Sequence, residues 1–155
     1  MNKKENLLIS ACLLGLYCRY DGKELHLDKL QDLMEKYHLI PICPEIMGGM
    51  GTPRNPIERK GDKAVDSSGK DITEHLEKGA KEALKLAKLF DCKYALLKER
   101  SPSCGFGRIY DGTFSGTLIN GNGVAADLLD ENGIKVFGES KIRKLLDNSD
   151  LSTTI

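Results

Sequence analysis

The fold is decided by one short stretch, Leu7-Leu-Ile-Ser-Ala-Cys-Leu-Leu-Gly15, in which an apolar run leads directly into a cysteine and ends at a glycine. An apolar run of this length, closed by a residue that breaks regular structure, is typical of a buried strand that passes into a loop. In an open α/β sheet, ligands bind at the edge where the carboxyl ends of the strands meet. The stretch therefore predicts a buried strand with Cys12 at the edge where a ligand binds.

The rest of the chain alternates between short apolar runs and segments with helical periodicity. Further strands are predicted at residues 39–43, 94–97 and 135–137. Helices are predicted at residues 28–37, 73–90 and 123–132, and after Ser140, which is expected to cap the last one. Such alternation indicates an α/β fold: one domain over residues 1–155 with a mainly parallel open sheet and helices on both faces, as in Rossmann-like and flavodoxin-like proteins.

Three segments interrupt this pattern. Residues 47–56 are predicted to form a long loop, because their glycines and prolines exclude both helix and regular strand. Residues 63–66 and the turn behind them are expected to form a small hairpin or a surface excursion, and residues 105–123 are compatible with more than one structure. Since long loops inside a compact domain are usually functional, residues 47–60 and 105–123 are expected to set the size of a substrate pocket.

The composition bounds the class of protein. A chain of 155 residues has the length of one ordinary domain. Its 23 basic and 23 acidic residues balance, so no polycationic surface indicates a nucleic-acid partner. No apolar run reaches the ~20 residues of a membrane span, and no signal-peptide pattern is recognisable. The sequence therefore predicts a cytoplasmic protein with neither a nucleic acid nor a membrane as its partner.

The five cysteines are an odd number in a chain without an export signal. In a reducing compartment such cysteines are more often buried, catalytic or bound to metal than joined in disulfides. None of the short zinc spacings, such as C-x-x-C, occurs in the sequence. Any metal site must therefore be assembled by the fold from distant segments.

Three of these cysteines, Cys12, Cys43 and Cys104, each follow an apolar run and precede a glycine or proline. If the first strand is central and the other two are its neighbours, the three thiols meet at one edge of the sheet, where adjacent strands lie about 4.8 Å apart. Three thiolates suit an iron–sulfur cluster with one open iron, or a catalytic zinc. The alternative is that they are small core residues, since free cysteine is often buried.

Four motifs occur in order along nearly the whole chain: Ser10-Ala-Cys-Leu-Leu-Gly with Arg19-Tyr-Asp-Gly22, Cys43-Pro-Glu45, Gly49…Pro53-Arg54…Glu58, and Lys98…Ser101-Pro-Ser-Cys-Gly105. Together they resemble the 2-thiouracil desulfurase family. The resemblance implies an α/β domain with a [4Fe–4S] cluster on Cys12, Cys43 and Cys104. It also implies that the fourth iron binds the sulfur removed from a thiolated pyrimidine.

The resemblance frames the roles of the polar residues around these cysteines. Glu45 is expected to act as the general base that activates water, although a surface or helix-start carboxylate is the alternative. Ser101 is expected to orient the pyrimidine or relay a proton, and Ser103 to bind substrate, although Ser-Pro is also ordinary turn chemistry. Arg54 is expected to bind an anionic edge of the substrate or to pair with Glu45, with an ion pair to Glu58 as the alternative.

The other candidate ligands are set aside. Cys18 is treated as a neighbour of the site, because its C-x5-C spacing from Cys12 has no fixed metal meaning. Cys92 is expected in the core. His26, His38 and His75 are excluded as ligands, since they fall in or near predicted helices away from the motif loops.

The function predicted from these features is that of an iron–sulfur-dependent desulfurase. It would convert a small thiolated nucleobase, 2-thiouracil or a similar pyrimidine, to the oxo form and release sulfide. One alternative is a phosphatase- or sulfurtransferase-like enzyme with Cys12 as nucleophile. Its interval to Arg19, C-x6-R, departs from the C-x5-R of cysteine phosphate loops. A second alternative is a non-catalytic sensor that binds metal or a thionucleobase.

Overall fold

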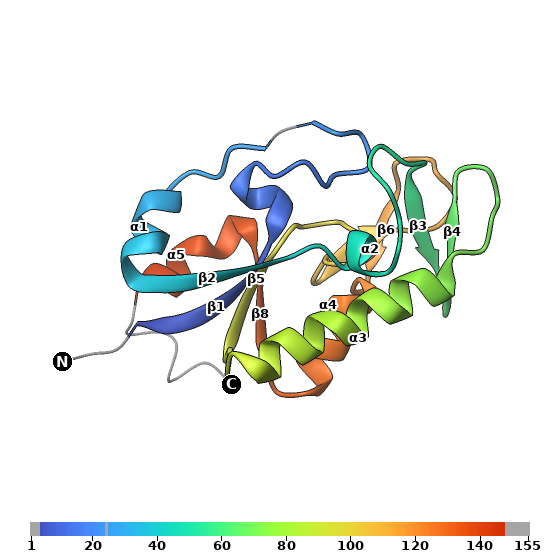
Figure 1. Ribbon diagram of the computed structural model, residues 1–155. Coiled ribbons are helices and arrows are strands. Elements are labelled where there is room, and N and C mark those ends of the chain that lie inside the picture. Colours follow the sequence, from blue (N-terminus) through green and yellow to red (C-terminus); the bar gives the residue numbers. More distant parts are fainter. Residues whose placement is uncertain (1–3, 24, 148–155) are drawn as a thin grey trace.

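The computed structural model describes residues 4–23 and 25–147. At its centre lies a four-stranded sheet in the order β2-β1-β5-β8 (Figure 1). The strands are β1 (Glu5–Ser10), β2 (Tyr37–Ile42), β5 (Tyr94–Leu97) and β8 (Lys135–Gly138). Every neighbouring pair is parallel, so the four carboxyl ends lie at one edge. The predicted fold class is confirmed.

The strand β1 is central, between β2 and β5. Leu7 pairs with Leu39 on one side and with Tyr94 on the other. Pro41 lies opposite Ile9 on β2, which is an edge strand of this sheet. Proline is tolerated there because an edge strand has one side on which no N–H is needed. The order of the strands therefore brings the ends of β1, β2 and β5 next to one another.

Helices cover both faces of the sheet (Figure 1). On one face, Leu8, Ala95 and Leu97 pack against α3 (Thr73–Leu89) and α4 (Val124–Glu131). On the other face, Leu7 and Leu96 pack against α1 (Leu30–Lys36), α5 (Ile142–Leu146) and the 3₁₀ helix η1 (Ala11–Leu14). Successive side chains of a strand point to opposite faces, so one apolar run supplies both halves of the core. None of the helices in the described ranges is long and apolar enough to cross a membrane.

Two local predictions are corrected. The helix predicted at 28–37 is shorter at both ends, because α1 begins at Leu30 and Tyr37 already pairs with Glu5 as the first residue of β2. Ser140 does not cap the last helix. It lies within the 3₁₀ helix η2 (Glu139–Lys141), and its hydroxyl donates to Glu99 instead.

Two antiparallel hairpins occupy segments whose structure the sequence left open. One joins β3 (Ile57–Lys60) to β4 (Lys63–Asp66), and the other joins β6 (Arg108–Tyr110) to β7 (Leu118–Asn120). Of the two alternatives for residues 63–66, the structure shows a hairpin, but its turn lies at residues 61–62, before this segment, and its other arm is β3, where a loop was predicted. The strands β3 and β6 contact each other beyond the carboxyl edge of the sheet (Figure 1).

A close contact between two helices fixes the turn after β2. The short helix α2 (Pro44–Met47) lies against α3. A glycine stands at the contact on each side, Gly48 directly after α2 and Gly79 within α3. A Cβ atom at Gly79 would lie 1.7 Å from the carbonyl oxygen of Pro44, and one at Gly48 would lie 2.0 Å from the carbonyl oxygen of His75. Only glycine permits this approach, so α3 determines where Cys43 and α2 lie.

Candidate active site

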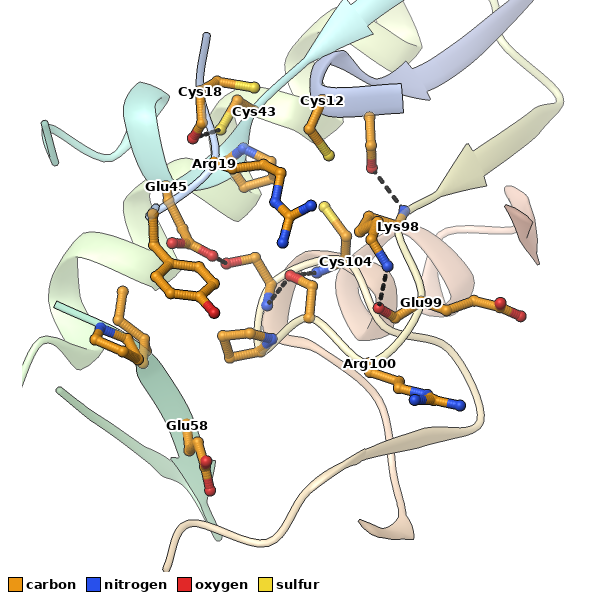
Figure 2. A pocket seen from close by; sticks show the side chains of 18 of the residues that line it. Cys12, Cys18, Arg19, Cys43, Glu45, Glu58, Lys98, Glu99, Arg100 and Cys104 are labelled. Carbon is orange, nitrogen blue, oxygen red and sulfur yellow. Dashed lines mark hydrogen bonds between the residues drawn. The ribbon is translucent and has the colours of Figure 1, made fainter. Parts of the chain in front are cut away.

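A cavity of about 460 Å³ opens at the carboxyl edge of the sheet (Figure 2). Its walls come from the ends of β1, β2 and β5 and from the two hairpins. All seven residues predicted for the site line it: Cys12, Cys43, Glu45, Arg54, Ser101, Ser103 and Cys104. Cavities at this edge are the usual ligand sites of open α/β sheets.

The three predicted ligand cysteines reach the cavity from three neighbouring strand ends. Cys12 lies in η1 directly after β1, Cys43 follows β2, and Cys104 lies in the loop after β5. All three are free thiols. Burial raises the pKa of Cys104 to about 12. The pKa of Cys43 is also raised, mainly by the adjacent Cys18 thiol and to a lesser extent by burial. These two thiols are protonated at neutral pH in the metal-free protein, so binding a metal would release their protons.

Cys18 lies beside the site, as the sequence predicted. Its buried thiol lies beside those of Cys12 and Cys43, and its interaction with the Cys12 thiol is the main cause that raises the pKa of Cys18 to about 11. The thiol of Cys43 also donates to the Cys18 carbonyl oxygen at 3.8 Å. Cys92, by contrast, lies in the core beneath α3. Four thiols therefore lie near one another at one edge of the sheet.

The arrangement of these groups bears on the kind of metal centre. Within residues 4–23 and 25–147, no three His, Cys, Asp or Glu side chains come together as a single metal ion requires. None of the three histidines lines the cavity, and His75 is hydrogen-bonded to the Gly48 carbonyl oxygen. The three cysteines line one cavity from three neighbouring strand ends, which fits a centre that all three hold together.

Glu45 is buried at the start of α2, with 8% of its surface exposed. One carboxylate oxygen, Oε1, accepts a hydrogen bond from Arg54 Nε at 2.8 Å. The other, Oε2, accepts one from Ser103 Oγ at 3.1 Å. The carboxylate is held from both sides, and the alternative of a surface carboxylate is wrong.

Arg54 is bound by the protein itself. Besides Glu45, its guanidinium donates to the Gly51 carbonyl oxygen at 2.9 Å, to Thr52 Oγ1 at 3.2 Å and to the Cys18 carbonyl oxygen at 2.8 Å. The ion pair with Glu58 that the sequence left open is absent from the described residues, where Arg54 pairs with Glu45. The guanidinium therefore connects the loop before β3, the loop of Cys18 and the helix α2.

The loop after β5 is organised by two serines. Ser101 Oγ accepts hydrogen bonds from the backbone N–H groups of Ser103 and Cys104, at 3.1 and 3.0 Å. Ser103 is almost fully buried and donates to Glu45. Ser10 Oγ accepts the N–H of Lys98 at 2.9 Å, which joins the ends of β1 and β5. Cys104 is therefore linked to Glu45 through Ser101, which binds the backbone of Cys104 and Ser103, and through the Ser103 hydroxyl, which binds Glu45.

Sequence reasoning assigned no role to several residues that the structure brings to the cavity. Tyr110 and Phe114 line it from the second hairpin. They lie in segments without helical or strand periodicity, so no pattern predicted their direction. The only available signal was the presence of aromatic residues in a glycine-rich segment.

The parallel sheet, with three cysteines at its carboxyl edge and a buried carboxylate beside them, defines an α/β protein with a cysteine-centred site. The family profile described as 2-thiouracil desulfurase matches residues 7–141, and the chain belongs to this family.

The chain is similar to two further proteins along nearly its whole length. The uncharacterized protein YbbK of Bacillus subtilis (strain 168) is 41% identical over 150 residues, an alignment that covers 90% of this chain and 99% of YbbK. The solved structure of the [4Fe-4S]-dependent thiouracil desulfidase TudS superposes with a TM-score of 0.88 at 42% sequence identity. It covers 97% of this chain and 100% of that one.

Proposed function

We propose that this protein is a [4Fe–4S]-dependent desulfidase that converts a thiolated pyrimidine, 2-thiouracil or a close analogue, to its oxo form and releases sulfide. The observation that carries the proposal is the arrangement of Cys12, Cys43 and Cys104 around one cavity, at the ends of three neighbouring strands. Membership of the 2-thiouracil desulfurase family and the likeness to TudS support the same reaction.

The residues present fit the cluster. Three thiols that line one cavity would hold three irons, and a fourth iron would have no protein ligand. When bound, the cluster supplies a thiophilic Lewis acid for the sulfur of the substrate. A catalytic zinc on the same three thiols is the alternative, and iron and sulfide analysis of the purified protein distinguishes the two.

Glu45 is proposed as the general base. It takes a proton from water, the water oxygen attacks the carbon that carries the sulfur, and the sulfur leaves as sulfide, so no external oxidant or reductant is needed. Each carboxylate oxygen of Glu45 accepts one protein hydrogen bond, and a carboxylate offers about four acceptor positions. Acceptor positions therefore remain for the proton of the water.

Ser101 is proposed to contact the substrate. Its oxygen accepts two backbone N–H groups and its side chain is hydrogen-bonded to the Cys104 thiol, so the hydroxyl lies beside a predicted cluster ligand, on the wall of the cavity that a pyrimidine would enter. Ser103 and Arg54 were predicted to bind substrate. Their bonds to Glu45 support a positioning role for both, because they hold the base in one orientation.

The test is anaerobic purification and reconstitution with iron and sulfide, followed by incubation with 2-thiouracil. We expect a brown protein with iron–sulfur absorbance that forms uracil and sulfide in equal amounts. A protein that takes up no iron would overturn the proposal. A cluster-loaded protein that binds thiopyrimidines without forming product would indicate the sensor alternative, and turnover without iron that depends on Cys12 alone would indicate the nucleophile alternative.

A further inference from the structure

The turn between β6 and β7 is attached to β3 by a buried carboxylate. Glu58 has 9% of its surface exposed, and its Oε1 accepts the N–H groups of Gly112 and Phe114, at 3.0 and 3.1 Å. No cation is paired with Glu58 among the residues of the described ranges. Bonds from backbone N–H groups to a carboxylate are among the stronger hydrogen bonds in proteins. Glu58 therefore holds residues 111–117 in one place.

A second contact attaches the same turn to the same strand. Gly112 has a φ of +95°, and a Cβ atom at this position would lie 2.8 Å from the Cβ of Lys60. Within the turn, Asp111 Oδ1 accepts both the N–H and the hydroxyl of Thr113, at 2.9 and 2.6 Å. The turn is thus rigid in itself and closely packed on β3.

Phe114 lies on this turn and lines the cavity, yet 38% of its surface is exposed. An aromatic ring exposed at a cavity offers a flat apolar face, and any nucleobase can stack on such a face. Figure 2 shows Glu58 well away from Cys12, Cys43 and Cys104, so its carboxylate does not serve the reacting end of the site. Its effect on a substrate passes through the turn that it holds.

We propose that Phe114 contacts the ring of the substrate and that Glu58 is the positioning residue that keeps it there. The pair sets the affinity for the thiolated pyrimidine and leaves the rate of C–S bond cleavage to Glu45 and the cysteines. The inference rests on the proposed function for the identity of its substrate.

The test is the steady-state kinetics of the cluster-loaded variants with 2-thiouracil. Phe114→Ala should raise KM by roughly 10-fold with kcat changed less than about threefold, as expected for the loss of one base–aromatic stacking contact. Phe114→Tyr, which keeps the ring, should retain the wild-type KM. Phe106→Ala is the matched control, because Phe106 is a comparably exposed aromatic of the same segment that does not line the cavity.

The role of Glu58 is also tested through the KM for 2-thiouracil. Glu58→Ala should raise KM as Phe114→Ala does, and the double variant should be no worse than Phe114→Ala alone, because the two residues act in series. Glu58→Gln, which keeps an oxygen acceptor, should restore most of the affinity. In hydrogen exchange, the amides of Gly112 and Phe114 should exchange faster in Glu58→Ala, while Glu77→Ala on the exposed face of α3 should change neither measurement.

Several results would overturn this inference. An unchanged KM in Phe114→Ala, or a fall in kcat alone, would show that the ring does not bind substrate. Multiplied effects in the double variant would show that Glu58 acts independently of Phe114. If the wild-type protein carries the cluster but releases no sulfide, the proposed function fails, and the Kd of 2-thiouracil for wild type and Phe114→Ala decides the inference separately.

Discussion

Arg54 Nε lies 2.8 Å from Glu45 Oε1, and the two side chains are only 8% and 11% exposed. This ion pair crosses from the loop before β3 to the start of α2, directly behind Cys43. A buried ion pair contributes little net stability in itself, but removing one partner leaves an uncompensated buried charge. The pair therefore makes the stability of the loop and the orientation of Glu45 depend on the same contact.

Replacement of Arg54 should damage both properties. Arg54→Gln should lower the free energy of unfolding by roughly 3 kcal/mol, as for other broken buried ion pairs, and reduce kcat with 2-thiouracil. Arg54→Lys should rescue little, since an ammonium group cannot replace a guanidinium that reaches four acceptors. Urea denaturation and sulfide release measure the two effects. Arg108→Gln, an exposed arginine on β6, is the control, and wild-type values for Arg54→Gln would contradict the interpretation.

Glu45→Gln tests the role of Glu45 as a base separately from its role in the structure of the site. The amide keeps the shape of the side chain and an acceptor oxygen, but it cannot take a proton from water. We expect kcat to fall by about 100-fold or more, which is the usual contribution of a general base, with iron content unchanged. Iron analysis and product formation are the measurements. A Glu45→Gln variant that turns over at the wild-type rate would rule out this residue as the base.

The four neighbouring thiols can be distinguished by single substitutions. Cys12→Ser, Cys43→Ser and Cys104→Ser should each lose most of the bound iron and the visible iron–sulfur absorbance. Cys18→Ser should keep both, although its thiol lies beside those of Cys12 and Cys43. Cys92→Ser, in the core, is the control for loss of a thiol outside the site. Loss of iron from Cys18→Ser, with retention in one of the other three, would reassign the ligands.

The contact between α3 and α2 predicts an effect of a residue outside the cavity. Gly79→Ala would place a methyl group 1.7 Å from the carbonyl oxygen of Pro44, so the two helices must separate. We expect a loss of roughly 1–3 kcal/mol in the free energy of unfolding, as for other overpacked positions, and weaker iron binding because Cys43 moves with Pro44. Denaturation of the apoprotein and iron titration measure these effects.

Lys78→Ala is the matched control for this experiment. It adds no atoms and lies at an exposed position of the same helix. If Gly79→Ala and Lys78→Ala are equally stable and bind iron equally, the close approach of α2 does not control the position of Cys43.

The sequence by itself determined the features that depend on local pattern. The run Leu7–Ile9 indicated a buried strand, and the alternation of runs and helical periods indicated a parallel sheet with covered faces. From these two inferences it follows that Cys12, Cys43 and Cys104 lie at the same edge of the sheet, whereas the order β2-β1-β5-β8, which makes their strands neighbours, came only from the structure. The physical reason is that a strand or helix with a buried face must place apolar residues at regular intervals along the chain, and this spacing can be seen in the sequence.

Only the tertiary structure decided which polar groups meet. Glu45 pairs with Arg54, nine positions away, while Glu58 binds the turn at Phe114 across 56 positions. Loops have no hydrophobic period, so their side-chain partners depend on where distant elements hold them. Glycine contacts such as that of Gly79 with Pro44 are of this kind, since the space available to a Cβ atom is a property of the packed molecule and not of the local chain.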